Sequence, residues 1–496
     1  MGIPELPVPD GLVLRPFRGV RFAVEDPAKV TSPPYDLISD ADVGALLDSH
    51  PNNVVRLILP CSSRKQSAPP AGDAPPPQST QPSRTGAPPQ PGEAPLEGRY
   101  AEARDTLKAW LDAGVLVPDD VPALYVYEQS GPDILQRGLI GDVGLVDPGR
   151  RIILPHEDVV PGPIADRLAL MSTTQANLEP IFLLYDGGNG TTTELVNEVA
   201  AQRRPLVSAH TEDGLTHRLW AITDPAEIAA INADLHDRQA LIADGHHRYA
   251  TYRVLQRQER AARKPRHTPQ PAPSSPSTSA SPNTRAPAAT EKTPGRTAEP
   301  PVEHAGRPWD FGLALLVDSA AYPPNLKAIH RVIPGLPLTE ATAKAKGSWH
   351  VDDYDDVAQG LAALEEAQEP AFLLAGAEGG GSHLLTNPDP VQLALAMPAD
   401  HSDHWNSLNT SVLTEFVLPK VWGMHDDEQT VRIVHHDVEA AVRLAVRTGG
   451  TAVILKPLAA DDVRAVAAGG ERVPRKSTSF GPKPRTGLVL RTFAID

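Results

Sequence analysis

The sequence predicts an α/β (or α+β) protein with mixed sheets in two lobes, interrupted by two disordered Pro-rich insertions. Three observations predict this class. Short β-branched apolar runs alternate with segments whose apolar residues recur at helical spacing. The alternation lacks the regular strand–helix–strand rhythm of a doubly wound parallel sheet. Two low-complexity stretches hold about 20 of the 53 prolines.

The low-complexity stretches divide the chain. Residues 62–98 and 263–307 consist mainly of Pro, Ala, Ser, Thr and Gln. They offer too little apolar surface to offset the entropy lost on ordering, so we expect both to be disordered. The predicted N-terminal lobe then comprises residues 1–61 plus 99–262, and the predicted C-terminal lobe comprises residues 308–496.

Local patterns predict the elements of the first lobe. Ser39 suits the N-cap of a helix over residues 40–47, because its hydroxyl can accept from a free backbone N–H. The β-branched run 54–59 predicts a strand. Further strands are expected at residues 123–127, 138–145, 180–185 and 239–244. Further helices are expected at residues 100–113, 164–172, 224–235 and 248–262.

The second lobe shows the same alternation. An apolar run predicts a strand at residues 311–317, at the start of this lobe. A helix is expected at residues 437–447, a strand at 452–455 and a helix at 460–468. Both lobes are therefore expected to contain sheet and helix together.

The charge distribution restricts the partners. The net charge is −16, and nucleic-acid binding needs clustered Lys and Arg, so we expect no nucleic-acid partner. Between Glu471 and Asp496 no acid occurs, but six cations do: Arg472, Arg475, Lys476, Lys483, Arg485 and Arg491. A local basic segment in an acidic chain favours a small anionic ligand.

The sequence has one cysteine and no pattern of a signal peptide or a membrane span, and these features bear on disulfide bonds and on the compartment. Cys61 is the only cysteine, which excludes an intramolecular disulfide and a cysteine-based zinc cage. The first residues lack the pattern of a signal peptide, and no run of about 18 apolar residues occurs. We therefore expect a cytoplasmic protein without a membrane contact.

The segment Ala243–Tyr249 carries the strongest functional signal. It reads Ala-Asp-Gly-His-His-Arg-Tyr where a predicted strand leads into a predicted helix. Backbone N–H groups at a helix N-terminus attract anions, and Gly245 permits close approach of a ligand. His246, His247 and Arg248 add donors suited to phosphate. Asp244 could orient a histidine, hold a metal ion, accept a proton or simply cap the helix.

Two further polar clusters are candidates. His156, Glu157 and Asp158 follow a proline, and this group suits a general base or a magnesium ligand set, or an exposed polar loop. The segment Val473–Lys483, which contains Arg475, Lys476 and Ser477, has two lysines, an arginine and three hydroxyls between prolines and could bind an anion, or could be a basic surface loop. The order of residues in that loop is not a phosphate-binding P-loop, because the preceding glycines are missing.

Seven strings in order resemble one family, the bacterial and archaeal proteins catalogued as domain of unknown function 1015. The strings begin at Leu14, Pro33, His156, Asn177, Ile242, Lys327 and Pro474. They read LRPFRGVRF, PPYD, HE, NLEP, IADGHHRY, KAIHRV and PRKSTSFGPKP. The family usually has Met-Pro-Pro-Lys-Ser-Thr where this chain has Val473 to Thr478, so the Lys-Ser-Thr core is retained.

A shorter resemblance bears on the ligand. Asp-Gly-His-His-Arg is similar to the phosphate-contacting motif of the ParB/sulfiredoxin-like superfamily, which includes free-serine kinases and CTP-binding ParB proteins. That resemblance implies that Gly245, His246, His247 and Arg248 hold nucleotide phosphates. A short motif raises an expectation and does not establish an activity.

Three functions remain open from the sequence. The first is a nucleotide-dependent phosphotransferase acting on a small hydroxylated metabolite, with serine as the first candidate and ATP or ADP with Mg²⁺ as cofactor. Glu157 or Asp244, beside His156, would deprotonate the acceptor or place the metal, and Lys476 and Arg475 would neutralise charge. The second is a nucleotide-binding regulatory module of the ParB kind, and the third is a metal-dependent hydrolase.

Overall fold

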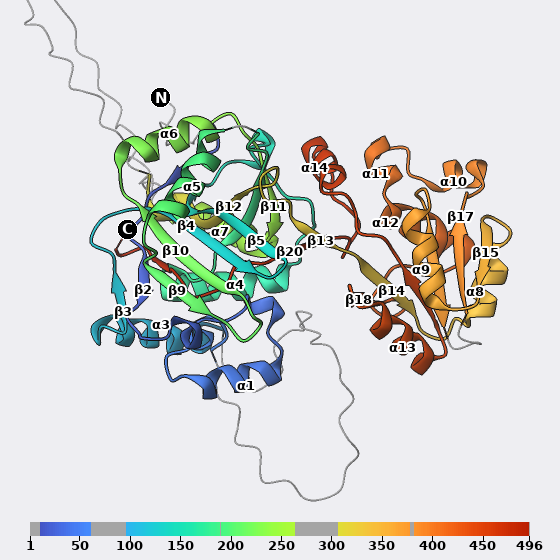
Figure 1. The fold of residues 1–496 in the computed structure, drawn as a ribbon, viewed down its shortest axis with the longest axis horizontal. Coiled ribbons are helices and arrows are strands. Elements are labelled where there is room, and N and C mark those ends of the chain that lie inside the picture. Colours follow the sequence, from blue (N-terminus) through green and yellow to red (C-terminus); the bar gives the residue numbers. More distant parts are fainter. Residues whose placement is uncertain (1–9, 61–95, 189, 263–305, 377–380, 496) are drawn as a thin grey trace, which may run out of the picture.

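The computed structural model describes residues 10–60, 96–188, 190–262, 306–376 and 381–495. Cys61 and nearly all of the two predicted insertions lie outside these residues. The described chain forms two lobes side by side, each with its own sheet (Figure 1). Both sheets are accompanied by helices, so the predicted class with mixed sheets in two lobes is confirmed.

The first lobe is built on a sheet of nine strands within the described residues. Eight strands run in the order β6-β11-β8-β12-β5-β4-β10-β9, and β1 pairs with β5. β11 is parallel to β6, β12 is parallel to β8, and the other neighbours are antiparallel. In that order the bounds are Ile153–Leu154, Ala240–Asp244, Ile181–Tyr185, Phe311–Asp318, Ile134–Gly144, Leu124–Gly131, Thr216–Ile222 and Val207–His210, with β1 at Leu14–Arg15.

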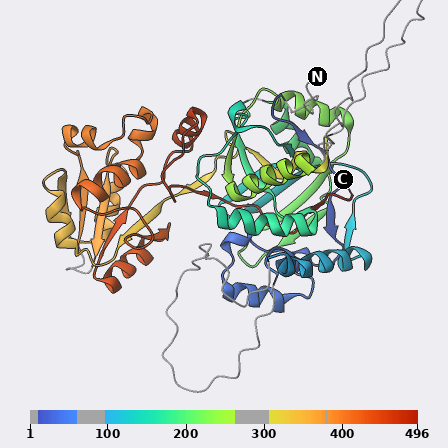
Figure 2. The ribbon, with the colours of Figure 1, turned by 180° about the vertical axis from the view of Figure 1, so that it is seen from behind.

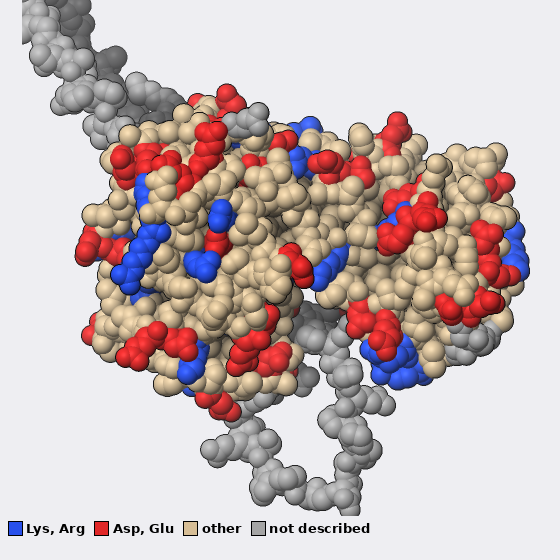
Figure 3. All heavy atoms as spheres, viewed as in Figure 1, with Lys and Arg blue, Asp and Glu red and all other residues tan. Residues whose placement is uncertain are grey.

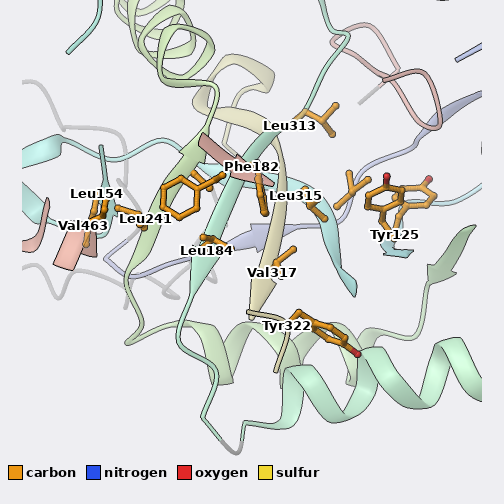
Figure 4. Packing of buried hydrophobic residues seen from close by; sticks show 14 of the residues in the cluster. Tyr125, Leu154, Phe182, Leu184, Leu241, Leu313, Leu315, Val317, Tyr322 and Val463 are labelled. Atoms are coloured by element: carbon orange, nitrogen blue, oxygen red, sulfur yellow. The ribbon is translucent and has the colours of Figure 1, made fainter. Parts of the chain in front are cut away.

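Both faces of this sheet are buried. On β8, Leu183 packs with residues of helices α5, α6 and α7 on one face, and Leu184 packs on the opposite face. Figure 2 shows helices lying across the sheet. The α-helices of this lobe are α1 (Asp40–Ser49), α2 (Val55–Ile58), α3 (Leu96–Asp112), α4 (Pro161–Thr174), α5 (Thr191–Gln202), α6 (Pro225–Leu235) and α7 (His246–Ala262). Figure 4 shows Leu184, Leu315 and Val463 in the hydrophobic core on this opposite face of the first sheet. Near-continuous apolar strands are expected for a sheet covered on both faces.

The second lobe contains a six-stranded antiparallel sheet in the order β15-β17-β16-β19-β14-β18. In that order the bounds are His350–Tyr354, Ser382–Thr386, Phe372–Gly376, Thr451–Ile454, Ile329–Ile333 and Arg432–His435. Its helices are α8 (Leu338–Ala345), α9 (Val357–Glu366), α10 (Pro390–Ala396), α11 (Asp403–Ser407), α12 (Asn409–Val412), a π-helical segment (Leu413–Val421) and α13 (Val438–Thr448). Helix α14 (Ala460–Gly469) lies between the lobes and packs its buried face into the core of the first lobe.

Short strand pairs tie distant parts of the chain together. β13 (Asn325–Lys327) and β20 (Ser479–Gly481) pair where the chain crosses between the lobes. β21 (Arg491–Thr492) pairs with β7 (Ala176–Asn177) in the first lobe. β2 (Val20–Phe22) pairs with β3 (Leu116–Pro118). The C-terminal residues therefore return to the first lobe.

The boundary predicted at residue 308 does not match the sheets. β12 begins at Phe311 and lies between β8 and β5 in the first sheet, and β21, near the C-terminus, pairs with β7 of the first lobe. The predicted boundary at residue 308 follows the change in composition at the end of the low-complexity stretch. The partners of β12 lie more than a hundred residues earlier, and local composition carries no information about them.

The strand predicted at residues 54–59 is wrong, because the structure has helix α2 there. The Asn53 side chain accepts a hydrogen bond of 3.0 Å from the Val55 backbone N–H, as a helix-capping residue does. Val55, Leu57 and Ile58 are all buried, so the run is apolar on every side. A short apolar run of this kind does not distinguish a strand from a buried helix.

The remaining expected elements are present, with ends shifted by a few residues. Ser39 caps α1 through a reciprocal pair of hydrogen bonds with Asp42. Asp224 caps α6, and α7 begins at His246, two residues before the expected start. Among the described helices, none combines the length and the apolar character that a membrane span requires.

We predict that Arg491→Ala strongly destabilises the first lobe. Arg491 is fully buried, and its Nε lies 2.7 Å from the buried carboxylate of Asp142, which also binds Arg15 at 2.9 Å. Removing the guanidinium leaves a buried charge short of one partner, which costs about 3–5 kcal/mol. Urea unfolding measures the change. The exposed Arg447→Ala is the control, and a loss below about 1 kcal/mol for Arg491→Ala would contradict the prediction.

Candidate functional site

The turn between β11 and α7 is fixed by backbone geometry. Gly245 has φ +92°, and a Cβ there would lie 3.0 Å from Ile181 Cγ2 and 3.1 Å from Arg248 Nε. Glycine is therefore required at this position. The first helical hydrogen bond runs from Tyr249 N–H to the Gly245 carbonyl. The N–H groups of His246, His247 and Arg248 precede it and have no acceptor inside the helix.

Arg248 faces the protein interior and not solvent. It is 5% exposed, its Nη1 donates to the Pro180 carbonyl at 2.6 Å, and its Nη2 binds Asp244 Oδ2 at 2.5 Å. Burial opposes its charge, but Asp244 and Glu179 outweigh burial, so the pKa of Arg248 is raised. Arg248 thus holds the shape of the turn. The sequence pattern could not distinguish this position from one that reaches a ligand.

A lysine from the far end of the chain closes the turn. Lys483 Nζ lies 2.5 Å from Asp244 Oδ1 and 2.6 Å from Asp36 Oδ2. Burial alone would lower the pKa of Lys483, but the two carboxylates raise it overall, so the ammonium stays charged. Burial raises the pKa of Asp244, and the neighbouring Asp36 adds to that effect. Both carboxylate oxygens of Asp244 therefore have a cationic partner.

Asp36 was not among the residues expected to form the site, and Lys483 was expected only as part of the basic loop and not beside Asp244. Asp36 belongs to the string Pro-Pro-Tyr-Asp and Lys483 to the basic segment, so both were visible as features of the sequence. Their pairing spans 447 positions, and no local pattern reports it. Asp36 keeps 37% of its side chain exposed, so it is the solvent-facing carboxylate of this group.

His156 and Glu157 lie beside the turn because β6 is parallel to β11. The His156 backbone N–H donates to His246 Nε2 at 3.3 Å. Thr478 joins the two expected clusters: its hydroxyl donates to Glu157 Oε1 at 2.9 Å and lies 2.8 Å from His156 Nε2. The Val473 N–H donates to the His156 carbonyl at 2.9 Å. The basic segment therefore contacts the His-Glu cluster directly.

His156 and His246 are neutral at physiological pH. Burial lowers the pKa of each imidazole to about 3, helped by His246 in the case of His156 and by His247 in the case of His246. A histidine with so low a pKa is a poor proton carrier near pH 7. Both rings are better suited to neutral hydrogen bonding that orients their neighbours.

The basic loop presents one of its three expected residues to solvent. The Arg475 guanidinium binds the buried carboxylate of Asp426 at 2.8 Å, and the buried Ser477 hydroxyl donates to the Pro474 carbonyl at 2.6 Å. Lys476 is exposed, and its backbone has φ +53°. Lys476 is the most exposed of the three residues, whereas Arg475, with 35% of its side chain exposed, is already paired with Asp426.

Charged side chains from three distant segments act electrostatically on His247. Its ring accepts a hydrogen bond of 3.2 Å from the Val160 N–H. Burial lowers the pKa of His247, Lys476 and Arg248 lower it further, and Glu157 and Asp36 act in the opposite direction. We call His247, Glu157, Asp36 and Lys476 the His247 group. It brings together the three polar clusters that are far apart in the sequence.

The other side of the turn offers little space. A cavity of about 30 Å³ lies behind Arg248 and is also lined by Arg167, Glu179 and Tyr252. Arg248 Nε is buried and has no hydrogen-bond partner in the described part of the chain. Such a volume suits about one water molecule and excludes a nucleotide. This cavity is therefore not the place for a nucleotide.

The outer surface carries mixed charge. On the face in Figure 3, acidic side chains are spread over both lobes, and Lys and Arg lie singly or in small groups among them. Within the described ranges, no group of three or more His, Cys, Asp or Glu side chains is arranged to hold a metal ion. The hydrolase hypothesis, which needs His156, Glu157, Asp244, His246 and His247 on one ion, gains no support from this arrangement.

The sequence of this two-lobed α/β protein matches the model of one known family. Residues 14–74 and 83–411 match the family described as "Protein of unknown function (DUF1015)", and the chain belongs to this family. The resemblance inferred from the seven strings is thereby confirmed. No curated protein matches the sequence.

Several solved structures show a weak likeness. A mutant free serine kinase in complex with ADP is 12% identical at a TM-score of 0.32, covering 70% of this chain and 91% of its own. C-terminally truncated SbnI from Staphylococcus aureus is 10% identical at 0.33, covering 72% and 88%. A conserved hypothetical protein from Pyrococcus furiosus is 12% identical at 0.31, covering 70% and 94%. These scores are too low to assign a ligand or an activity to this chain.

The two buried histidines make stability depend on pH. In the unfolded chain their pKa is 6.5, against about 3 when folded, so the unfolded chain binds more protons between these values. Their contribution to stability is complete above pH 6.5 and falls as the pH drops toward 3. Lowering the pH from 6.5 to 5 should remove about 2 kcal/mol per histidine from the free energy of unfolding.

Urea unfolding at several pH values checks this dependence. His246→Gln should lose stability less steeply below pH 6.5 than the wild type, because one of the two groups no longer titrates. The exposed His350→Gln should keep the wild-type slope. An unchanged slope in His246→Gln would show that His246 is not held neutral.

Proposed function

We propose that this protein is a nucleotide-dependent phosphotransferase that acts on a small hydroxylated metabolite, with serine as the first candidate. The observation that carries the proposal is the His247 group. It combines the start of α7 with a solvent-reaching carboxylate and an exposed lysine whose charges act on one imidazole. Binding phosphate, accepting a proton and neutralising charge are the three tasks of phosphoryl transfer.

The phosphate-binding role falls to the backbone of the turn. The N–H groups of His246, His247 and Arg248 carry the partial positive charge of the start of α7. Arg248 and Lys483 lie behind them and add positive potential while holding Asp244 in place. The assignment of Arg248 to direct phosphate contact is replaced by this supporting role. His247 and Lys476 are the side chains placed to donate to phosphate oxygens.

Glu157 is the proposed general base. Its Oε1 accepts from Thr478, while the side chain keeps 28% of its surface exposed. The acceptor hydroxyl would give its proton to the Glu157 carboxylate as its oxygen attacks the terminal phosphorus. The bond between that phosphorus and the nucleotide oxygen breaks, and the shortened nucleotide leaves. Asp244 is not the base, because both of its oxygens are held by cations.

Magnesium would arrive with the nucleotide. Mg²⁺ in such sites binds one or two carboxylates together with substrate phosphates and water. With Glu157 acting as the base, Asp36 is the solvent-reaching carboxylate of the His247 group that suits that role. A bound ion would neutralise charge on the phosphates.

Exposed apolar side chains next to the group favour a nucleotide over a free phosphate. Leu37 follows Asp36 and is 56% exposed, and Val160, whose N–H binds His247, is 55% exposed. Large apolar side chains at a rim suit the flat face of a nucleobase. We infer that the protein works in the cytoplasm, where nucleotides and free amino acids are available.

We predict that Glu157→Gln abolishes transfer but retains nucleotide binding. Purified protein is incubated with ATP or ADP, Mg²⁺ and a panel of amino acids, and phosphorylated products are measured by mass spectrometry. Loss of the base should reduce turnover by about 100-fold or more. Nucleotide affinity by calorimetry should change far less, because the backbone of the turn is unaltered.

The control is Glu366→Gln, at an exposed carboxylate of α9 in the second lobe, which should behave as wild type. Absence of both nucleotide binding and product in the wild type would overturn the proposal. Nucleotide binding that changes assembly without any product would support the non-catalytic regulatory module instead.

A further inference from the structure

A buried arginine of the second lobe holds the loop that carries Lys476. Arg331 lies in β14, belongs to the string Lys-Ala-Ile-His-Arg-Val, and is 1% exposed. Its Nη2 donates to the carbonyls of Arg475 and Lys476, each at 3.0 Å. Its Nη1 donates to the Ile329 carbonyl at 3.1 Å. The planar guanidinium thus fixes two consecutive peptide groups at once.

The carboxylate of Asp426 balances the charge of Arg331 and also binds the loop through Arg475. Asp426, 4% exposed, binds the Arg475 guanidinium at 2.8 Å and acts electrostatically on Arg331. Burial lowers the pKa of Arg331 to about 10, which leaves it charged at neutral pH. The second lobe therefore holds Arg475 by its side chain and by its carbonyl.

Lys476 has the conformation that such a restraint would produce. Its φ of +53° lies in the left-handed region, which residues with a Cβ rarely adopt. Strained backbone of this kind persists where the surrounding structure over-determines it. Here the restraint comes from the hydrogen bonds of Arg331 to the loop carbonyls and from the ion pair between Asp426 and Arg475. The lysine side chain is left exposed, and its charge acts on His247 across the boundary between the lobes.

We propose that Arg331 is a positioning residue, which holds Lys476 in the left-handed conformation so that its ammonium group meets the terminal phosphate of the bound nucleotide. This inference rests on the proposed function and adds a role for the second lobe. That lobe would set the preference for nucleotides by their number of phosphates. A nucleoside monophosphate does not extend to Lys476, whereas a diphosphate or triphosphate does.

Calorimetry with ATP, ADP and AMP tests the proposal on the full-length protein. Lys476→Ala should weaken ATP or ADP binding by roughly 10- to 100-fold, the size of one charge-assisted contact, and AMP binding by less than about 3-fold. The control is Lys346→Ala, an exposed lysine at the end of α8, which should leave all three affinities unchanged.

Arg331→Lys tests positioning, because a lysine keeps the charge but cannot donate to two carbonyls in the same geometry. It should show the same nucleotide pattern as Lys476→Ala. The double variant should be no weaker than Lys476→Ala alone, since Arg331 acts through Lys476. Lys476→Arg, which keeps a cation at the loop, should restore at least part of the ATP affinity.

The outcomes separate the two proposals. Wild-type protein that binds none of the three nucleotides overturns the proposed function and this inference with it. Wild-type binding that Lys476→Ala leaves unchanged overturns this inference alone. Additive losses in the double variant, or equal losses for AMP and ATP, would give Arg331 a general structural role and would also overturn it. Thermal unfolding confirms that each variant is folded before its affinity is compared.

Discussion

The ammonium group of Lys483, held between Asp244 and Asp36, is the interaction on which the rest of the site depends. It connects three segments from the beginning, middle and end of the chain. In the same fold, Thr478 reaches Glu157 and His156, and the charge of Lys476 acts on His247. Charges buried in this way need their partners, because an unpaired one would destabilise the interior. The site is therefore assembled only in the complete fold.

The arrangement also separates support from contact. Asp244, His246 and Arg248 are buried and bind other protein groups, whereas His247, Glu157 and Lys476 reach solvent. The helix start supplies donors whose positions do not change when a ligand arrives. Fixed donors of this kind stabilise developing charge better than flexible side chains do. The residues of the motif are therefore not equivalent: Asp244, His246 and Arg248 support the turn, and His247 is left to contact a ligand.

The sequence predicted local structure well and pairing poorly. The strand, turn and helix from residue 240 to 262 followed from spacing and a glycine, and the structure has them nearly as expected. The strand prediction at residues 54–59 was wrong because a short buried apolar run fits a strand and a buried helix equally well. β12 was placed in the wrong lobe because its partners in the sheet are distant. The partners of Lys483 and Thr478 were not predicted for the same reason, since these contacts span more than 300 positions.

The central claim is that one ligand is held jointly by the turn after β11 and by the C-terminal segment. Hydrogen–deuterium exchange with and without ADP or ATP tests it most directly, because it reports on both segments in one experiment. The account predicts that saturating nucleotide slows exchange in residues 245–250 and in residues 474–480 together, with the same concentration dependence. Protection confined to other parts of the chain, or to one of these segments alone, would contradict it.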